Sequence, residues 1–203
     1  MASTLPLPVL TLTRDLVLEP AGALERVAAA RPPLWPLTRD HVLPLALIMP
    51  VAQGIALALG DAQARFGDGG IALQFLVLSA VHSVALSLAA VGVFAVLANL
   101  LAPWFGGHRD FAQALRLGAC AATPVWLSTA VLVVPMRDFP LLTAVVFAGL
   151  VHGAYLACVG LQIMLGVRAD EAGPCTAFLL AGAAAGSVLL GYAVSAAGLL
   201  PFI

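Results

Sequence analysis

The chain has 203 residues, of which 62% are hydrophobic and only 9% are charged, and its mean hydropathy is +1.06. Soluble domains carry about 25% charged residues, so this composition excludes an ordinary soluble domain and predicts a membrane protein. The net charge of -1 lacks the basic excess that nucleic-acid binding requires, and we expect no nucleic-acid partner.

Residues 1–37 form the predicted amino-terminal arm, which precedes the long apolar stretches. Its segment AGALERVAAARPP can form a short amphipathic helix with one side made of Leu24, Val27, Ala28 and Arg31. Such a helix would lie among the lipid headgroups of the cytoplasmic face, with Trp35 at the membrane surface. The alternative is a disordered leader, because periodicity over so few residues is weak evidence.

Five apolar stretches follow, each long enough for a bilayer-crossing helix, which needs about 20 mostly apolar residues. They run over residues 41–59, 71–101, 111–134, 141–165 and 175–200. No long polar segment separates them, so residues 38–203 are predicted to form one transmembrane domain. The predicted fold class is therefore all-α, a polytopic membrane protein with a single bundle of five transmembrane helices behind a short cytoplasmic amphipathic segment.

Arginines set the predicted orientation of this bundle. All nine basic residues are arginines, and only Arg65 and Arg137 fall on the side opposite the arm. Because cytoplasmic loops carry an excess of basic residues, the amino terminus is predicted to be cytoplasmic. The heavy use of Ala, Leu and Arg is typical of a GC-rich bacterial genome. We therefore expect a cell inner membrane location with a periplasmic carboxyl terminus.

Prolines interrupt two of the predicted spans. Pro44 and Pro50 fall inside the first, and Pro124 falls inside the third. Each proline frees a carbonyl of the preceding turn, so kinks are expected at these positions. At Pro124 a packing kink is favoured over a broken helix that builds a transport site.

Small residues recur at helical spacing in the last two spans. The candidate helix-packing positions are Gly149, Gly153, Gly160, Gly182 and Gly186. This spacing lets helix backbones approach closely, which drives helix association in membranes. It favours packing inside one bundle, with contact between copies of the chain as the alternative.

Polar residues follow one side of the second span. Ser79, His82, Ser83 and Ser87 lie together at helical spacing, and they are expected to face protein because lipid would leave their polar atoms unpaired. His152, on the small-residue side of the fourth span, completes this candidate intramembrane polar site. Either the two imidazoles are structural, or they form a site for a ligand, metal or proton between the second and fourth spans. We expect His82→Leu to loosen the fold more than Val81→Leu.

Four segments carry a family likeness: LEPAGALERVAAARPP, HVLPLALIMPVAQGI, LAPWFGGHRDFAQALRLGACAATPVWLS and YLACVGLQIMLGVRADEAGPCTAF. With them the chain resembles the Yip family of five-span membrane proteins, and its bacterial branch in particular, over about residues 17–200. The resemblance implies five helices, a cytosolic amino terminus and no catalytic residues. For eukaryotic relatives it implies small-GTPase binding in membrane traffic, an analogy that the short arm and its lack of a docking motif limit.

The favoured function is non-enzymatic organisation of lipids, other membrane proteins or copies of the chain itself. The alternative is a small transporter or proton-coupled channel that uses the His/Ser cleft. Against the alternative, the spans contain no Asp, Glu or Lys, and Arg116 can snorkel to the membrane surface. No nucleophile–base motif or metal-ligand spacing occurs, so we expect no enzymatic activity, no metal site and no cofactor.

Overall fold

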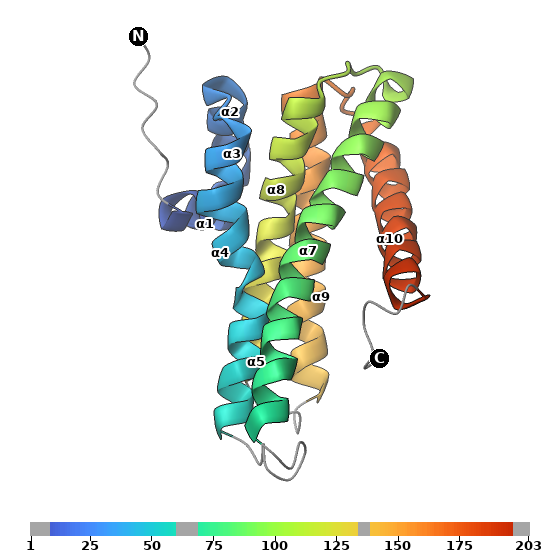
Figure 1. Ribbon diagram of the computed structural model, residues 1–203. Helices are drawn as coiled ribbons and strands as arrows, with labels where there is room; N and C mark the ends of the chain where they lie inside the picture. The colour runs from blue at the N-terminus through green and yellow to red at the C-terminus, as the bar shows by residue number, and fades with distance from the viewer. Residues whose placement is uncertain (1–8, 60–68, 134–138, 197–203) are drawn as a thin grey trace.

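The computed structural model describes residues 9–59, 69–133 and 139–196, and all regular elements in these ranges are helices (Figure 1). The four long helices are α7 (Gly69–Leu101), α8 (Phe111–Ser128), α9 (Phe139–Leu165) and α10 (Ala172–Ala196). With the 3-10 turns that follow α7 and α8, they supply four stretches apolar and long enough to cross a membrane: Leu76–Phe105, Phe111–Val131, Pro140–Leu165 and Ala172–Leu189. The all-α membrane class is thus confirmed. These stretches correspond to the predicted second to fifth spans, whose residues 134 and 197–200 lie outside the described ranges, as do Arg65 and Arg137.

The predicted first span is divided into short helices. From residue 34 onward the chain forms α3 (Leu34–Leu37), the π-helix η1 (Thr38–Val42), α4 (Leu43–Ala46) and α5 (Ile48–Leu59). Pro44 and Pro50 account for these changes, because neither ring nitrogen can donate a hydrogen bond to the preceding turn. Kinks were expected at the two prolines, and next to them the structure shows changes in helix type, at η1 and between α4 and α5.

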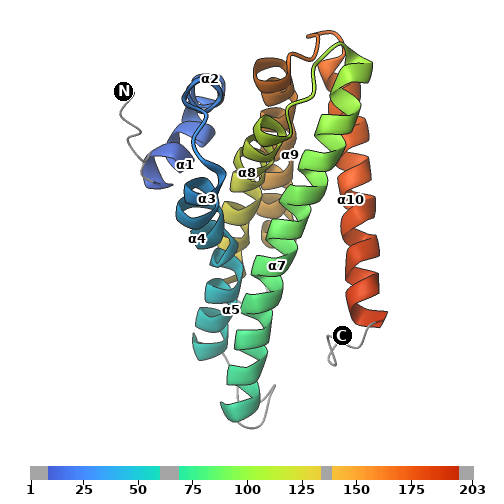
Figure 2. The same cartoon turned by 45° about the horizontal axis from the view of Figure 1, so that its top comes forward.

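The amino-terminal arm consists of two helices, α1 (Val9–Leu18) and α2 (Pro20–Ala30), which pack against the bundle. Leu24 and Val27 are fully buried on the side of α2 that faces α8 and α9. Arg31 ends α2 in the left-handed conformation, with a φ of 44°. Figure 2 shows the arm on the side of the bundle away from α10. The helix predicted in segment 21–33 is present, but its apolar side packs on the bundle and does not lie among lipid headgroups.

The four long helices form a ring around a common centre. α7 packs on α8, α8 on α9, α9 on α10 and α10 on α7, whereas α7 and α9 make at most marginal contact across the ring. Outside it, α5 packs against α7 and against η3 (Thr129–Val133), the turn that continues α8. The largest fully buried side chains in the ring include Leu117, Leu156, Leu161 and Leu179.

At the end of the ring where α2 ends, the loop before α8 and the loop after α9 are hydrogen-bonded to each other. After η2 (Ala102–Phe105), the N–H of His108 donates to the carbonyl of Leu165 at 2.8 Å. A β-carbon on Gly107 would lie 2.6 Å from that same carbonyl oxygen, so only glycine allows this approach. The N–H of Arg168 donates to the carbonyl of Phe105 at 3.3 Å. The loop that contains Gly106 and Gly107 therefore binds the carboxyl end of α9.

Candidate functional site

Two serines of the predicted polar stripe bind neighbouring helices. Ser79 Oγ donates to Gln53 Oε1 of α5 at 2.6 Å. Ser87 Oγ accepts a hydrogen bond from Trp126 Nε1 of α8 at 3.2 Å. These two positions of the stripe therefore face protein.

Ser83, the third serine, compensates for a donor that Pro50 lacks. In an uninterrupted helix the N–H of residue 50 would donate to the carbonyl of Ala46. Ser83 Oγ donates to that carbonyl instead, at 3.0 Å. Ala46 is buried, so a freed carbonyl there has little water to bind, and this bond satisfies it while joining α7 to α4.

Replacing Ser83 by alanine is expected to destabilise the bundle by about 1 kcal/mol, because the buried Ala46 carbonyl then loses its partner. The control is Ser187→Ala, since Ser187 Oγ donates to Ala183 of its own helix and little loss is expected there. Unfolding of both variants in a mild detergent provides the measurement. Equal losses would contradict the role assigned to Ser83.

The two histidines of the predicted site have different surroundings. His82 is half-buried and forms no hydrogen bond with any residue that the structure describes. His152 Nε2 donates to the carbonyl of Leu16 in α1 at 3.1 Å, and its ring lies 6.1 Å from that of Tyr155. His152 faces α1, and neither His82 nor His152 lines the cavity between α7 and α9. That His82→Leu loosens the fold more than Val81→Leu stays a prediction.

A third histidine, at the start of the predicted first span, is more deeply buried. His41 is 2% exposed, and its Nε2 lies 2.9 Å from Thr123 Oγ1. Thr123 Oγ1 donates to the carbonyl of Ala119 at 3.1 Å, so its oxygen accepts the proton from His41. In the sequence, His41 stands three residues before Pro44 and Thr123 directly before Pro124. Nearness to a proline inside a predicted span is a signal that could have identified both residues. The bond joins η1 to α8 just before Pro124, through which α8 stays helical.

The glycines of α9 mark its closest approach to α8. A β-carbon on Gly149 would lie 2.8 Å from the carbonyl oxygen of Pro124, and one on Gly153 would lie 2.7 Å from that of Ala121. Gly160 is covered by the side chain of Leu117. Backbone lies against backbone along this crossing, which larger residues would force apart.

The glycines of α10 meet a different helix. β-carbons on Gly182 and Gly186 would each lie 3.0 Å from a side chain of α7, Leu97 and Val93 respectively. Both glycine faces thus pack inside the bundle, each against a different neighbour.

An open cavity of about 610 Å³ lies between the four long helices of the ring. Its lining comes from all four long helices and includes Leu86, Phe94, Val125, Leu150, Leu180 and Ser187. This is the space between the second and fourth spans, where the polar cleft was predicted. Of the candidate polar residues, however, Ser87 alone lines it. The cavity falls within the usual size range of ligand pockets, about 300–1,000 Å³, and its surface is mainly apolar.

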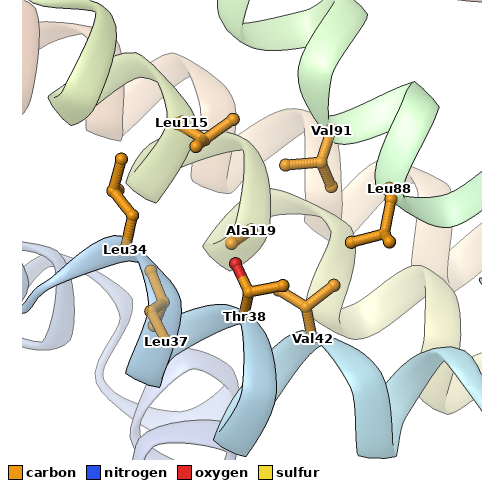
Figure 3. Close-up of a pocket in the computed structure, with 8 residues that line it drawn as sticks. All are labelled: Leu34, Leu37, Thr38, Val42, Leu88, Val91, Leu115 and Ala119. Atoms are coloured by element: carbon orange, nitrogen blue, oxygen red, sulfur yellow. The ribbon is translucent and has the colours of Figure 1, made fainter.

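A smaller cavity of about 160 Å³ lies where α3 and η1 meet α7 and α8 (Figure 3). Its lining consists of Leu34, Leu37, Thr38, Val42, Leu88, Val91, Leu115 and Ala119. The hydroxyl of Thr38 is the single polar side-chain group among these eight residues. Ligand pockets are usually larger, about 300 Å³ or more, so this space is a gap in helix packing.

Arg116 binds the arm. Its Nε donates to the carbonyl of Pro32 at 2.9 Å and its Nη2 to that of Arg31 at 3.4 Å. One turn earlier, Gln113 Nε2 donates to the carbonyl of Ala28 at 3.1 Å. The Arg116 residue is only 8% exposed, so its guanidinium is held by the arm and does not snorkel outward. These bonds to the end of α2 fix the arm to α8.

In the described parts of the chain, no group of three His, Cys, Asp or Glu side chains is placed to hold a metal. In comparison with known protein families, the model of the Yip1 domain matches residues 14–191. No curated protein and no solved structure matches the chain. The matched region includes the arm from Arg14 onward and nearly all of the bundle. The chain therefore belongs to the Yip1 domain family.

Proposed function

We propose that this chain is a five-span protein of a bacterial inner membrane that organises lipids or partner membrane proteins and catalyses no reaction. The divided helix from α3 to α5 supplies the first span and brings the total to five, because it runs beside α7 in Figure 1 and packs against it. The arm lies on the cytoplasmic side and the carboxyl terminus in the periplasm. Arg109 and Arg168, in the two loops beside the end of α2, support this orientation.

The observation that supports this function best is the apolar centre of the ring. Its cavity takes lining residues from four membrane-crossing helices, and none of these residues is charged. An ion would lose its hydration there without gaining a charged partner, whereas an acyl chain or an apolar side chain would lose nothing. The polar serines of α7 mostly bind neighbouring helices and offer few free groups for chemistry.

Crosslinking in native membranes, followed by mass spectrometry of what is attached, tests this proposal. We expect recovery of a lipid, a membrane protein or a second copy of the chain. A useful pair of variants is Ala183→Phe, which fills the central cavity, and Ala181→Phe, which alters an exposed position of the same helix. Loss of a crosslinked lipid in the first variant alone would locate its site, and failure to recover any partner from the wild type would contradict the proposal.

The transporter alternative has one supporting observation, the position of the cavity between α7 and α9. It requires a polar path, and His82, Ser79, Ser83 and His152 do not line that cavity. Proton or solute flux in proteoliposomes that disappears in His82→Leu would replace our proposal by this one.

Small-GTPase binding remains an analogy with eukaryotic relatives. The apolar side of α2 is buried against α8 and α9 and offers no free surface to a partner.

A further inference from the structure

The first arm helix lies deep along the bundle. The carbonyl of Leu16 in α1 accepts a hydrogen bond from His152 Nε2, and His152 stands 13 residues from each end of α9, which spans Phe139–Leu165. At about 1.5 Å of rise per residue, α1 therefore lies about 20 Å from either end of that helix. Figure 1 agrees, because α1 crosses the flank of the bundle well below the end where α2 finishes.

The side of the arm that faces away from the bundle carries charged residues, both in α1 and in α2. Arg14 and Glu19 are exposed, and Asp15 forms an ion pair with Arg26 at 2.6 Å, with both side chains partly exposed. α2 continues this polar side with Glu25. Charged side chains are costly inside hydrocarbon, so this side of the arm has to be in contact with headgroups and water.

Large apolar side chains lie both on the side of α1 that faces the bundle and on the side that faces away from it, as in an interfacial helix. Leu12 and Leu16 are buried against the bundle, whereas Leu10 is 83% exposed and Leu18 is 65% exposed. A helix that presents both charges and large apolar side chains outward is suited to the boundary between headgroups and acyl chains. The boundary on this side of the protein is thus expected at α1.

With α1 at this position, the apolar part of the bundle on the arm side is shorter than the hydrocarbon core of a bilayer. From α1 to the far end of α9 the bundle offers about 20 Å, whereas the hydrocarbon core of a bilayer is about 30 Å thick. On the opposite side the apolar stretch of α7 runs over 30 residues, from Leu76 to Phe105, which is more than enough to span. The mismatch is therefore confined to one side.

We propose that the protein thins the bilayer on its arm side, by drawing the headgroups of the arm-side leaflet about 10 Å toward the midplane beside α8 and α9. The partner of this surface is the phospholipid bilayer itself. Such a one-sided depression favours thin or curved membrane over flat, thick membrane. The inference rests on the membrane placement in the proposed function and specifies how the protein organises lipid.

The test compares two positions at one height on opposite sides of the bundle. Val17 follows Leu16, whose carbonyl binds His152 of α9. Val188 follows Ser187, which lines the central cavity together with Gly153, the residue next to His152. Nitroxide labels are placed at Val17→Cys or Val188→Cys, with the three native cysteines replaced by alanine, and the full chain is reconstituted in dioleoyl phosphatidylcholine vesicles. Collision with a water-soluble nickel chelate is measured against collision with oxygen, which concentrates in hydrocarbon.

We expect a nickel-to-oxygen collision ratio several-fold higher at Val17 than at Val188. Equally low ratios would place α1 in the acyl chains and overturn the proposal while leaving the proposed function intact. Equally high ratios would remove the bundle from the membrane and overturn both.

A second measurement uses the thickness of the bilayer. The wild type is expected to unfold at a higher temperature in short-chain than in long-chain phosphatidylcholine. Leu24→Asp, which releases the arm by placing a charge at a fully buried position, should lose this preference, and Ala21→Asp, at an exposed position of α2, should keep it. An identical dependence on chain length in wild type and Leu24→Asp would overturn the proposal.

Discussion

Replacing Gly153 by alanine is expected to destabilise the bundle by about 2–3 kcal/mol, because the new β-carbon needs space that the helix crossing does not provide. The nearest atom, 2.7 Å away, is the carbonyl oxygen of Ala121. A backbone atom cannot rotate aside as a side chain can, so α8 and α9 have to separate along the whole crossing. Gly149, one turn away, has the same constraint and should respond in the same way.

Gly92→Ala is the matched control. Gly92 also lies inside a long helix, α7, but a β-carbon there would meet no atom within 4 Å. Alanine at such a site is expected to be neutral or to stabilise by about 0.4–1 kcal/mol, since it restricts the unfolded chain. Unfolding in mild detergent, followed by circular dichroism, separates the two variants. Similar midpoints for both would contradict the close crossing of α8 and α9.

Replacing Arg116 by methionine is expected to release the arm from the bundle while the long helices stay folded. Hydrogen bonds from a charged donor contribute about 1.5–3 kcal/mol each when buried, and Arg116 donates two of them to the arm, to Pro32 and Arg31. A net loss of about 2 kcal/mol corresponds to a roughly 30-fold increase in opening of α2. Removing a buried cation offsets part of the lost bonding, which is why the net value is smaller than the sum of two bonds.

Amide hydrogen exchange provides the measurement for this variant. Exchange should rise in residues 20–30 and change little in α9. Arg109→Met is the control, because Arg109 is exposed in the adjacent loop and its loss should leave exchange in the arm unchanged. Unchanged exchange in the arm of Arg116→Met would mean that its apolar contacts alone hold it.

Several features of the fold followed directly from the sequence. Long uncharged stretches predict membrane-crossing helices because hydrocarbon admits few other backbone conformations, and α7, α8, α9 and α10 agree with that prediction. The Gly-Gly loop and the Thr-Pro pair of the third span carried the family resemblance, and the match to the Yip1 domain confirms it. The arm helix was correctly placed near residues 21–33, although α1 before it was not predicted, even though its buried residues Leu12 and Leu16 stand at helical spacing.

Other features depended on which helices become neighbours. Periodicity shows that Ser83 and His82 lie near one another on α7, but it does not show that Pro50 leaves a carbonyl opposite Ser83 and none opposite His82.

The sequence by itself determined that this chain is a helical membrane protein of the Yip family, because hydrophobic length and local motifs are properties of contiguous residues. Only the tertiary structure decided that the centre of the ring is apolar, that Arg116 binds the arm and that α1 sits halfway along α9. Each of these depends on contacts between residues far apart in the chain, and helical spacing carries no information about the partner that a given side meets.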